Sequence, residues 1–298
     1  MIKMPTFIVA TLLTGCVING DKYDRPRDLS AESFVDRTRI LAIRAEPPEL
    51  SPGEQADISA LLIDPNDEIE NTLWVACSEE DATSFGCAID FTGIDFTSSS
   101  PEELEEAGVI GFEPFLSPQF TAPEDALENL PEAERAEGTS SLVQAFAFPT
   151  MDGVSESFDF NTIESAFKRI VISEAATPNN NPIIETWTID GIPVSTSEPV
   201  RVAPGASIEV GIVLDEATIE SYTYLNSEGD IEQRTEEPYA RWYTSGGSID
   251  EEVTLYPYLD ASVRTPETVG TEGTWWTVVR DRRGGIAWVS QEFIVQAN

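Results

Sequence analysis

The chain of 298 residues contains no histidine. Histidine is the commonest general base and the commonest metal ligand, so its absence removes the usual way to build a catalytic triad or a zinc site. The sequence also lacks a Gly-x-Ser-x-Gly elbow, a phosphate-binding loop and a dinucleotide fingerprint. We therefore expect a protein that is not an enzyme and holds no cofactor or metal. A hydrolase with an unrecognised carboxylate site stays an alternative, because 54 acidic residues bring carboxylates together in any fold.

Basic residues are scarce. The chain has 17 Lys+Arg against 54 Asp+Glu, a net charge of −37, and its only lysines are Lys3, Lys22 and Lys168. Nucleic acids and anionic lipid surfaces are bound through clustered cations, which neutralise phosphate. The composition therefore excludes a polybasic membrane surface, and we expect no nucleic-acid partner.

Long apolar runs are missing as well. The apolar run near the start, residues 5–13, follows Lys3 and covers about nine residues, which is too short to span a bilayer. It has the length of the hydrophobic region of a signal peptide.

The residues after this run, Leu13-Thr14-Gly15-Cys16, resemble the lipobox of bacterial lipoproteins. That resemblance implies a signal peptide over residues 1–15, lipidation of Cys16 and a lipidated tether over residues 16–36. Val17 stands where the enterobacterial sorting rule places Asp for inner-membrane retention, which implies an outer-membrane, lipid-anchored protein on the periplasmic side or the cell surface. An ordinary signal peptide with an incidental cysteine is the alternative.

Only three cysteines are present. With Cys16 set aside, Cys77 and Cys87 remain, and an even remainder in an exported chain predicts a disulfide. Two free buried thiols are the alternative.

An internal repeat gives the best indication of architecture. "SPGEQADISALLID", from residue 51, aligns without gaps on "APGASIEVGIVLDE", from residue 203, at an offset of 152. Both segments follow a Pro-Gly turn and alternate apolar with other residues, which is the period of a half-buried strand. The aligned positions predicted to be buried are Ala56, Ile58, Ala60 and Leu62 in the first copy and Ile208, Val210, Ile212 and Leu214 in the second.

The repeat and the short strands between Pro/Gly turns predict an all-β chain of two tandem β-sandwich domains. "GTWWTVVRDRRGGIAWVSQEFIV" near the C-terminus resembles the final hairpin of bacterial Ig-like and PKD-type domains, which implies that fold for the second copy. The expected boundaries are 37–175 for Ig-like domain 1, 176–182 for a linker and 183–298 for Ig-like domain 2.

The first copy carries an acidic stretch. Residues 101–137 hold eleven acidic residues and one basic residue, Arg135. Ser or Thr near proline and acids in a first turn suit helix starts, so we expect an acidic, partly helical insertion over about residues 99–138. A solvated surface excursion is favoured over a partner-binding element.

Two further features are candidate binding sites. The segment "LIDPNDEIEN" (62–71) places several oxygen ligands in one loop, which could bind Ca²⁺, although it lacks the EF-hand spacing and a plain polar turn is favoured. Trp275 and Trp276 are adjacent on an expected strand, so they point to opposite faces and one of them leaves the core. That side chain is a candidate ligand contact for a sugar or a partner protein, unless loops or the first domain cover it.

Across the whole chain, "RILAIRAEPPELSPGE", "KRIVIS…PNNNPI" and "VVRDRRGGIAWV" resemble uncharacterised lipoproteins of myxobacteria and related deltaproteobacteria. That resemblance implies no activity. The sequence thus favours a non-enzymatic envelope lipoprotein whose Ig-like domains have binding or structural roles. Its expected partners are the membrane, through the N-terminal lipid, and an envelope protein or polysaccharide. A glycan-binding accessory protein is the alternative.

Overall fold

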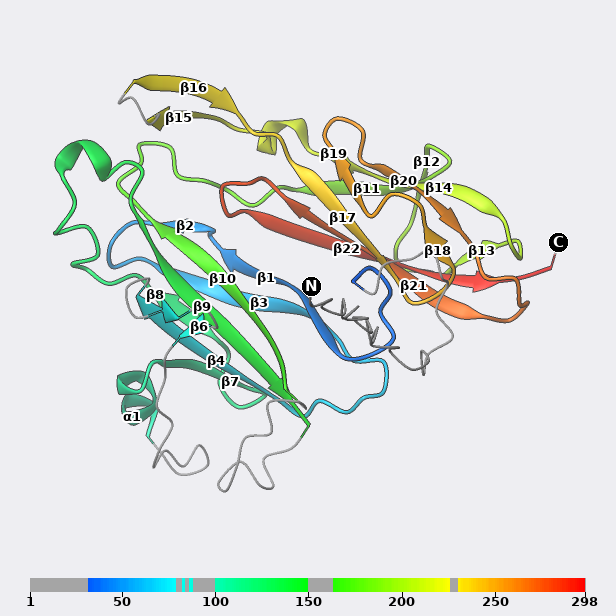
Figure 1. The fold of residues 1–298 in the computed structure, drawn as a ribbon, viewed down its shortest axis with the longest axis horizontal. Helices are drawn as coiled ribbons and strands as arrows, with labels where there is room; N and C mark the ends of the chain where they lie inside the picture. Colours follow the sequence, from blue (N-terminus) through cyan, green and yellow to red (C-terminus); the bar gives the residue numbers. More distant parts are fainter. Residues whose placement is uncertain are drawn as a thin grey trace, which may run out of the picture.

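The computed structural model describes residues 32–78, 82–83, 86–87, 100–149, 163–225 and 230–297. The expected signal peptide, Cys16 and most of the tether lie outside these described residues. The chain is all-β, and its described helices are one short α-helix and two 3-10 turns. Figure 1 shows the sheets of the N-terminal half, in blue to green, beside those of the C-terminal half, in light green to red.

The N-terminal half forms two sheets that pack face to face. The first sheet has the order β1-β3-β8 and the second has the order β2-β10-β9-β4-β7. Buried side chains from both sheets, among them Ile43, Ile58, Trp74 and Ile170, form a single core cluster. The strands are β1 (Arg39–Glu46), β2 (Glu49–Leu50), β3 (Gln55–Ile63), β4 (Asn71–Ser78), β7 (Val109–Glu113), β8 (Gln119–Thr121), β9 (Thr139–Phe148) and β10 (Glu164–Ile172).

The C-terminal half is built in the same way. Its sheets have the orders β12-β11-β14-β20-β18 and β13-β22-β21-β17-β19. They enclose a second core cluster that includes Trp187, Val210, Trp242 and Phe293. The strands are β11 (Ile184–Ile189), β12 (Ile192–Val194), β13 (Val200–Val202), β14 (Ser207–Leu214), β17 (Tyr239–Thr244), β18 (Ser248–Ile249), β19 (Val253–Leu255), β20 (Asp260–Arg264), β21 (Glu272–Arg280) and β22 (Ile286–Val295).

The two halves share one strand order. The series β11-β14-β20 matches β1-β3-β8, and β13-β22-β21-β17-β19 matches β2-β10-β9-β4-β7. The match extends to direction, since β2–β10 and β13–β22 are parallel pairs while the other matched neighbours are antiparallel. The C-terminal half adds the edge strands β12 and β18. The sequence repeat is therefore a repeat of sheet topology.

The predicted strand register is confirmed. Ala56, Ile58, Val210, Ile212 and Leu214 are buried, and Ala60, Leu62 and Ile208 are partly buried and pack against the same cores. The intervening acids Asp57 and Glu209 are exposed at matching positions. Each strand follows a tight turn whose glycine has a positive φ, 80° at Gly53 and 63° at Gly205, a conformation that glycine adopts without steric cost.

The acidic stretch differs from the expected continuous insertion over residues 99–138. It contains α1 (Pro101–Glu106) and η1 (Glu132–Glu134), but between them β7 joins the five-stranded sheet and β8 pairs with β3. Both strands have counterparts in the other half, β19 and β20. In and next to the acidic stretch, the chain is thus longer than in the other half at two connections, one between β4 and β7 and one between β8 and β9. The sequence does not predict these two strands, because "VIGFE" and "QFT" are too short to show a clear period among the acidic residues around them.

Two hairpins lie outside the main sheets. The hairpin of β5 (Ala82–Thr83) and β6 (Gly86–Cys87) follows β4, and the hairpin of β15 (Ser221–Leu225) and β16 (Ile231–Thr235) follows η2 (Glu216–Thr218). In Figure 1 the β15–β16 hairpin reaches beyond the sheets at the top of the molecule.

Candidate functional site

The sequence-predicted site residues fall in different parts of the molecule. Cys77 and Cys87 form the predicted disulfide, with a Cα–Cα distance of 5.7 Å, and tie the end of β4 to the β5–β6 hairpin. Cys16 lies outside the described residues, so lipidation stays a prediction. Within the described part of the chain, no helix is long and apolar enough to cross a membrane.

Neither candidate tryptophan is exposed, and the alternative in which the first domain covers the outward one is what the structure shows. Trp275 is 1% exposed and stacks on Phe293 in the core of the C-terminal half, with ring centroids 4.3 Å apart. Trp276 points to the other face of the sheet, as predicted, but is only 8% exposed. It packs in a cluster with Leu41 and Ala42 of β1, so the N-terminal half covers it.

The loop after β3 is a polar turn held by its own hydrogen bonds. Asp64 Oδ1 accepts from the Thr38 hydroxyl at 2.8 Å, and Asp64 Oδ2 accepts from the Ile69 amide at 2.6 Å. Burial acts to raise the pKa of Asp64, but these bonds stabilise the carboxylate and the net pKa is lowered. Among the described residues there is no group of three or more His, Cys, Asp or Glu side chains that could hold a metal ion.

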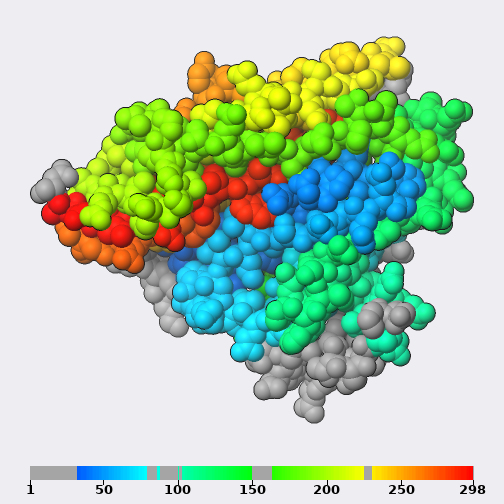
Figure 2. Space-filling view, turned by 180° about the vertical axis from the view of Figure 1, so that it is seen from behind, coloured from blue at the N-terminus to red at the C-terminus, as the bar shows by residue number. Residues whose placement is uncertain are grey.

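The structure instead brings polar and charged side chains together where the two halves meet. The segment before β1 crosses to the C-terminal half, where the Val35 amide donates to Thr244 O at 2.8 Å and the Thr244 amide donates to Ser33 O at 3.0 Å. Next to this contact lies an apolar cluster that includes Leu41, Tyr243 and Trp276. Figure 2 shows β1–β3, in blue and cyan, lying directly against the red C-terminal strand along this boundary. The halves are therefore in close contact.

A buried ion network closes one end of the junction. Arg283, in the turn between β21 and β22, lies 3.0 Å from Glu236, 3.1 Å from Glu220 and 3.4 Å from Glu49 of β2. Its guanidinium also lies 4.5 Å from the centre of the Tyr222 ring. Burial raises the pKa of Glu236, and the hydrogen bond from Arg283 acts in the opposite direction. One arginine thus links both halves and the base of the β15–β16 hairpin.

The linker between β10 and β11 is held within the junction. The backbone N–H of Asn179 donates to the Glu49 carboxylate at 2.7 Å, and the side-chain Nδ2 of Asn179 donates to the Asp281 carboxylate at 2.9 Å. Asn181 Nδ2 donates to Ala45 O at 2.7 Å and Asn181 Oδ1 accepts from the Ile286 amide at 2.7 Å. Burial raises the pKa of Asp281, against the hydrogen bonds that it accepts from Asn179 and from the turn. The predicted linker is therefore a bonded joint between the halves.

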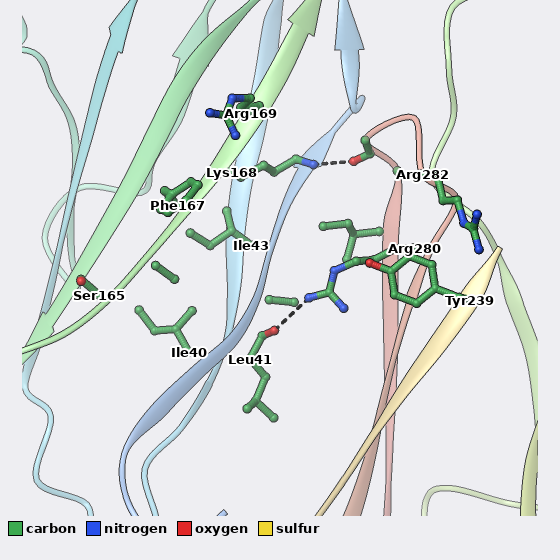
Figure 3. A pocket seen from close by; sticks show the side chains of 15 residues that line it. Ile40, Leu41, Ile43, Ser165, Phe167, Lys168, Arg169, Tyr239, Arg280 and Arg282 are labelled. Carbon is green, nitrogen blue, oxygen red and sulfur yellow. Dashed lines mark hydrogen bonds between the residues drawn. The ribbon is translucent and has the colours of Figure 1, made fainter. Parts of the chain in front are cut away.

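Beside this joint lies a cleft of about 710 Å³. One wall is formed by residues 40–43 of β1 and 165–169 of β10, and the other by Tyr239, Arg280 and the β21–β22 turn. Figure 3 shows Lys168 reaching from β10 to the carbonyl of Gly284, and Arg280 reaching to the carbonyl of Leu41. We refer to this space as the junction cleft.

The junction cleft is basic. Lys168, Arg169, Arg280 and Arg282 line it, and no lining residue is acidic. Lys168 is 6% exposed, and burial together with the nearby Arg280 lowers its pKa to about 8, although Asp281 acts to raise it. The cleft can therefore place two nearby positive charges, an ammonium and a guanidinium, in a partly apolar space.

Sequence reasoning missed this site. "DRRGG" (281–285) lies in the expected final hairpin and "NNN" (179–181) in the expected linker, and neither segment shows which distant residues it contacts. One local sign was present: Lys168 shares the inward parity of Ala166, Ile170 and Ile172 in "AFKRIVI" (166–172), and a lysine at a core position is rarely unpaired.

No protein-family model and no curated protein sequence matches the chain. Among solved structures, the fibronectin(III)-like modules of Clostridium thermocellum CbhA align at 8% identity over 86% of this chain and 95% of that chain, with a TM-score of 0.25. Three N-terminal domains of the bacteriophage RB49 Highly Immunogenic Outer Capsid protein align at 12% identity over 88% of this chain and 71% of that chain, with a TM-score of 0.21. The Yersinia pseudotuberculosis adhesin InvE aligns at 11% identity over 86% of this chain and 62% of that chain, with a TM-score of 0.22. These likenesses are too weak to carry an argument about this chain.

Proposed function

We propose that the protein is a non-enzymatic, lipid-anchored envelope protein that presents two Ig-like β-sandwich units for a binding or structural role. The observation that carries this proposal is the repeated strand order together with the bonded joint between the halves. Such an assembly presents its surfaces in one relative orientation, which suits a scaffold or a binding module.

The strand order supports Ig-like units. In an Ig-like sandwich, strands A, B and E share one sheet and strands C, F and G share the other. In the N-terminal half, β1, β3 and β8 take the first set of places and β4, β9 and β10 take the second. Strand C commonly carries a buried tryptophan, and both matching strands do: Trp74 on β4 and Trp242 on β17 are fully buried. Their indole N–H groups donate to the neighbouring strand in both halves, to Glu113 and to Thr254.

The lipid anchor rests on the lipobox alone and has a direct test. Cells expressing the Cys16→Ser variant should show no incorporation of labelled fatty acid into the protein, and the protein should leave the membrane fraction. The double variant Cys77→Ser/Cys87→Ser is the matched control, since it removes two cysteines and should keep the label. Continued labelling of Cys16→Ser would overturn the anchor.

The side of the membrane and the binding role are tested on the same cells. Protease added to intact cells should degrade a surface-exposed protein and spare one that faces the periplasm. Chemical cross-linking in intact cells followed by purification should yield a covalent complex with an envelope component. Purification of the uncross-linked chain alone, at native expression levels, would contradict the binding role.

A further inference from the structure

The junction cleft gathers positive charge in a protein that has little of it. Acidic residues outnumber basic residues by 54 to 17 in the chain, yet four basic and no acidic side chains line this cleft. Arg282 lies 3.9 Å from Glu237, and Arg169 lies over the ring of Phe167 at 5.9 Å. These two cations stand at the edge of the cleft in Figure 3, whereas Lys168 and Arg280 point across it.

Lys168 and Arg280 have no carboxylate partner among the described residues. Each donates one hydrogen bond to a backbone carbonyl, Lys168 to Gly284 and Arg280 to Leu41. An ammonium has three N–H donors and a guanidinium has five, so most of their donor capacity remains. Asp281, the acid whose charge acts on Lys168, already accepts from Asn179 and from three amides of the β21–β22 turn. Two neighbouring cations with unused N–H donors and no carboxylate partner can therefore bind an anion from outside the chain.

The fold itself does not require this cleft. Ile43 pairs with Ala60 in the N-terminal half, and Trp187 pairs with Ile212 in the C-terminal half. Because Ile212 aligns on Ala60, Trp187 stands where the N-terminal half has Ile43. The last strands, β10 and β22, are aligned through their parallel partners: Ile172 pairs with Leu50, and Val295 pairs with Val202, which aligns on Leu50. Four residues earlier on each strand, Gln291 stands where the N-terminal half has Lys168. The C-terminal half thus has a buried indole and a neutral amide at the positions where the N-terminal half has a smaller side chain and a buried cation.

We propose that the junction cleft is a binding site for an oxyanion group, a carboxylate or a phosphate or sulfate ester, held by Lys168 and Arg280. A guanidinium fork matches the two oxygens of such a group, and charge-assisted hydrogen bonds are stronger than neutral ones. Ile40, Ile43 and the exposed ring of Phe167 offer an apolar wall for the body of the ligand. The volume falls in the range of small-molecule sites, about 300–1,000 Å³. The site does not depend on the lipid anchor or on the envelope location.

The first test uses the scarcity of lysine. The full chain, labelled with ¹³C at lysine Cε, is titrated at low ionic strength with phosphate, sulfate, acetate and glucuronate, each to about 10 mM, a range that reveals dissociation constants near 1 mM. A bound anion should shift the Lys168 resonance and raise its pKa, while Lys22 stays unchanged. A response to phosphate or sulfate indicates an inorganic ion or an ester, and a stronger response to glucuronate indicates an acidic sugar. No shift at Lys168 with any of the four probes would overturn the proposal.

The second test compares variants by calorimetric titration with the strongest probe. Lys168→Met and Arg280→Gln should each weaken binding at least tenfold, and Arg264→Gln should bind as the wild type does, because Arg264 is exposed and paired with Glu267. Binding to the wild type should also weaken above about pH 8, where Lys168 loses its proton. The other charged groups around Lys168 are Arg169, Arg280 and Asp281. Equal affinity in all variants would contradict the assignment.

Discussion

At the scale of single residues, the junction depends on a few buried charges with distant partners. Arg283 lies near three carboxylates that come from segments more than 40 residues away in sequence. Removing one member of a buried ion network leaves uncompensated charge and costs about 3–5 kcal/mol. Exposed pairs contribute much less, about 0–1 kcal/mol.

We therefore expect Arg283→Gln to lower the free energy of unfolding by about 3 kcal/mol or more at pH 7.5. The loss should be smaller at pH 5, because burial already raises the pKa of Glu236 and protonation removes part of the repulsion that the variant creates. Urea unfolding at the two pH values measures both effects. Arg264→Gln should change stability by less than about 0.5 kcal/mol. Equal losses in the two variants would show that the network contributes no more than a surface pair.

Lys168 gives a second prediction at this scale, in which the stability difference between the wild type and a variant again grows with pH. Its pKa is about 8 in the folded protein and 10.5 ordinarily, so between these values the unfolded chain binds more protons and stability rises with pH. From pH 7 to pH 9.5 the wild type should gain about 2 kcal/mol relative to Lys168→Met. Urea unfolding of both proteins across this range measures the difference. A constant difference would mean that Lys168 titrates as an exposed lysine does.

At the scale of elements, each half depends on a strand that is buried on one face. β14 places Val210 in the core at 0% exposure and Val213 on the outside at 44%. Because the side-chain period of a strand is two, a slip of one residue would turn the whole set to solvent, so the register is strongly specified.

This strand offers a matched pair of substitutions. Val210→Ala should lower the free energy of unfolding by about 1–3 kcal/mol, since it removes two buried methyl groups and leaves a cavity. Val213→Ala makes the same chemical change on the exposed face and should stay within about 0.5 kcal/mol of the wild type. Denaturant midpoints compare the two. Similar losses in both variants would contradict the observed register.

At the scale of the whole molecule, the two halves share an apolar contact, an ion network and a bonded linker. Trp276 and Leu41 come from opposite halves and pack in one cluster. Since the contact is buried and hydrogen bonds flank it, unfolding one half exposes apolar surface on the other. We expect the wild type to unfold in one cooperative calorimetric transition.

The double variant Trp276→Ala/Arg283→Gln should separate this transition into two, since it weakens the apolar contact and the ion network together. Differential scanning calorimetry measures the number of transitions. Tyr258→Ala combined with Arg264→Gln is a control that removes an exposed aromatic ring and an exposed arginine. A single transition in the Trp276→Ala/Arg283→Gln variant would show that the halves are coupled by other contacts.

Much of the fold could be predicted from the sequence because it follows from local patterns. The alternation around Ile58 and Val210 determines which face of each strand is buried, and the Pro-Gly turns before β3 and β14 mark where those strands begin. The even number of cysteines left once Cys16 is set aside predicted the disulfide of Cys77 and Cys87. These features depend on residues a few positions apart, whose geometry the strand period and the turn chemistry determine.

The candidate site was decided by the tertiary structure alone. The strand period predicted that one of Trp275 and Trp276 leaves the core of its own half, but only the tertiary structure shows that this is Trp276 and that β1 covers it. Lys168 and Gly284 lie 116 residues apart in sequence, and Glu49 and Arg283 lie 234 apart. A local pattern carries no information about such pairs, because the docking of one half on the other brings them together. The sequence by itself determined the repeated strands and their registers. The contact between the two halves determined the cleft, the charges that line it and the N–H donors left unused there.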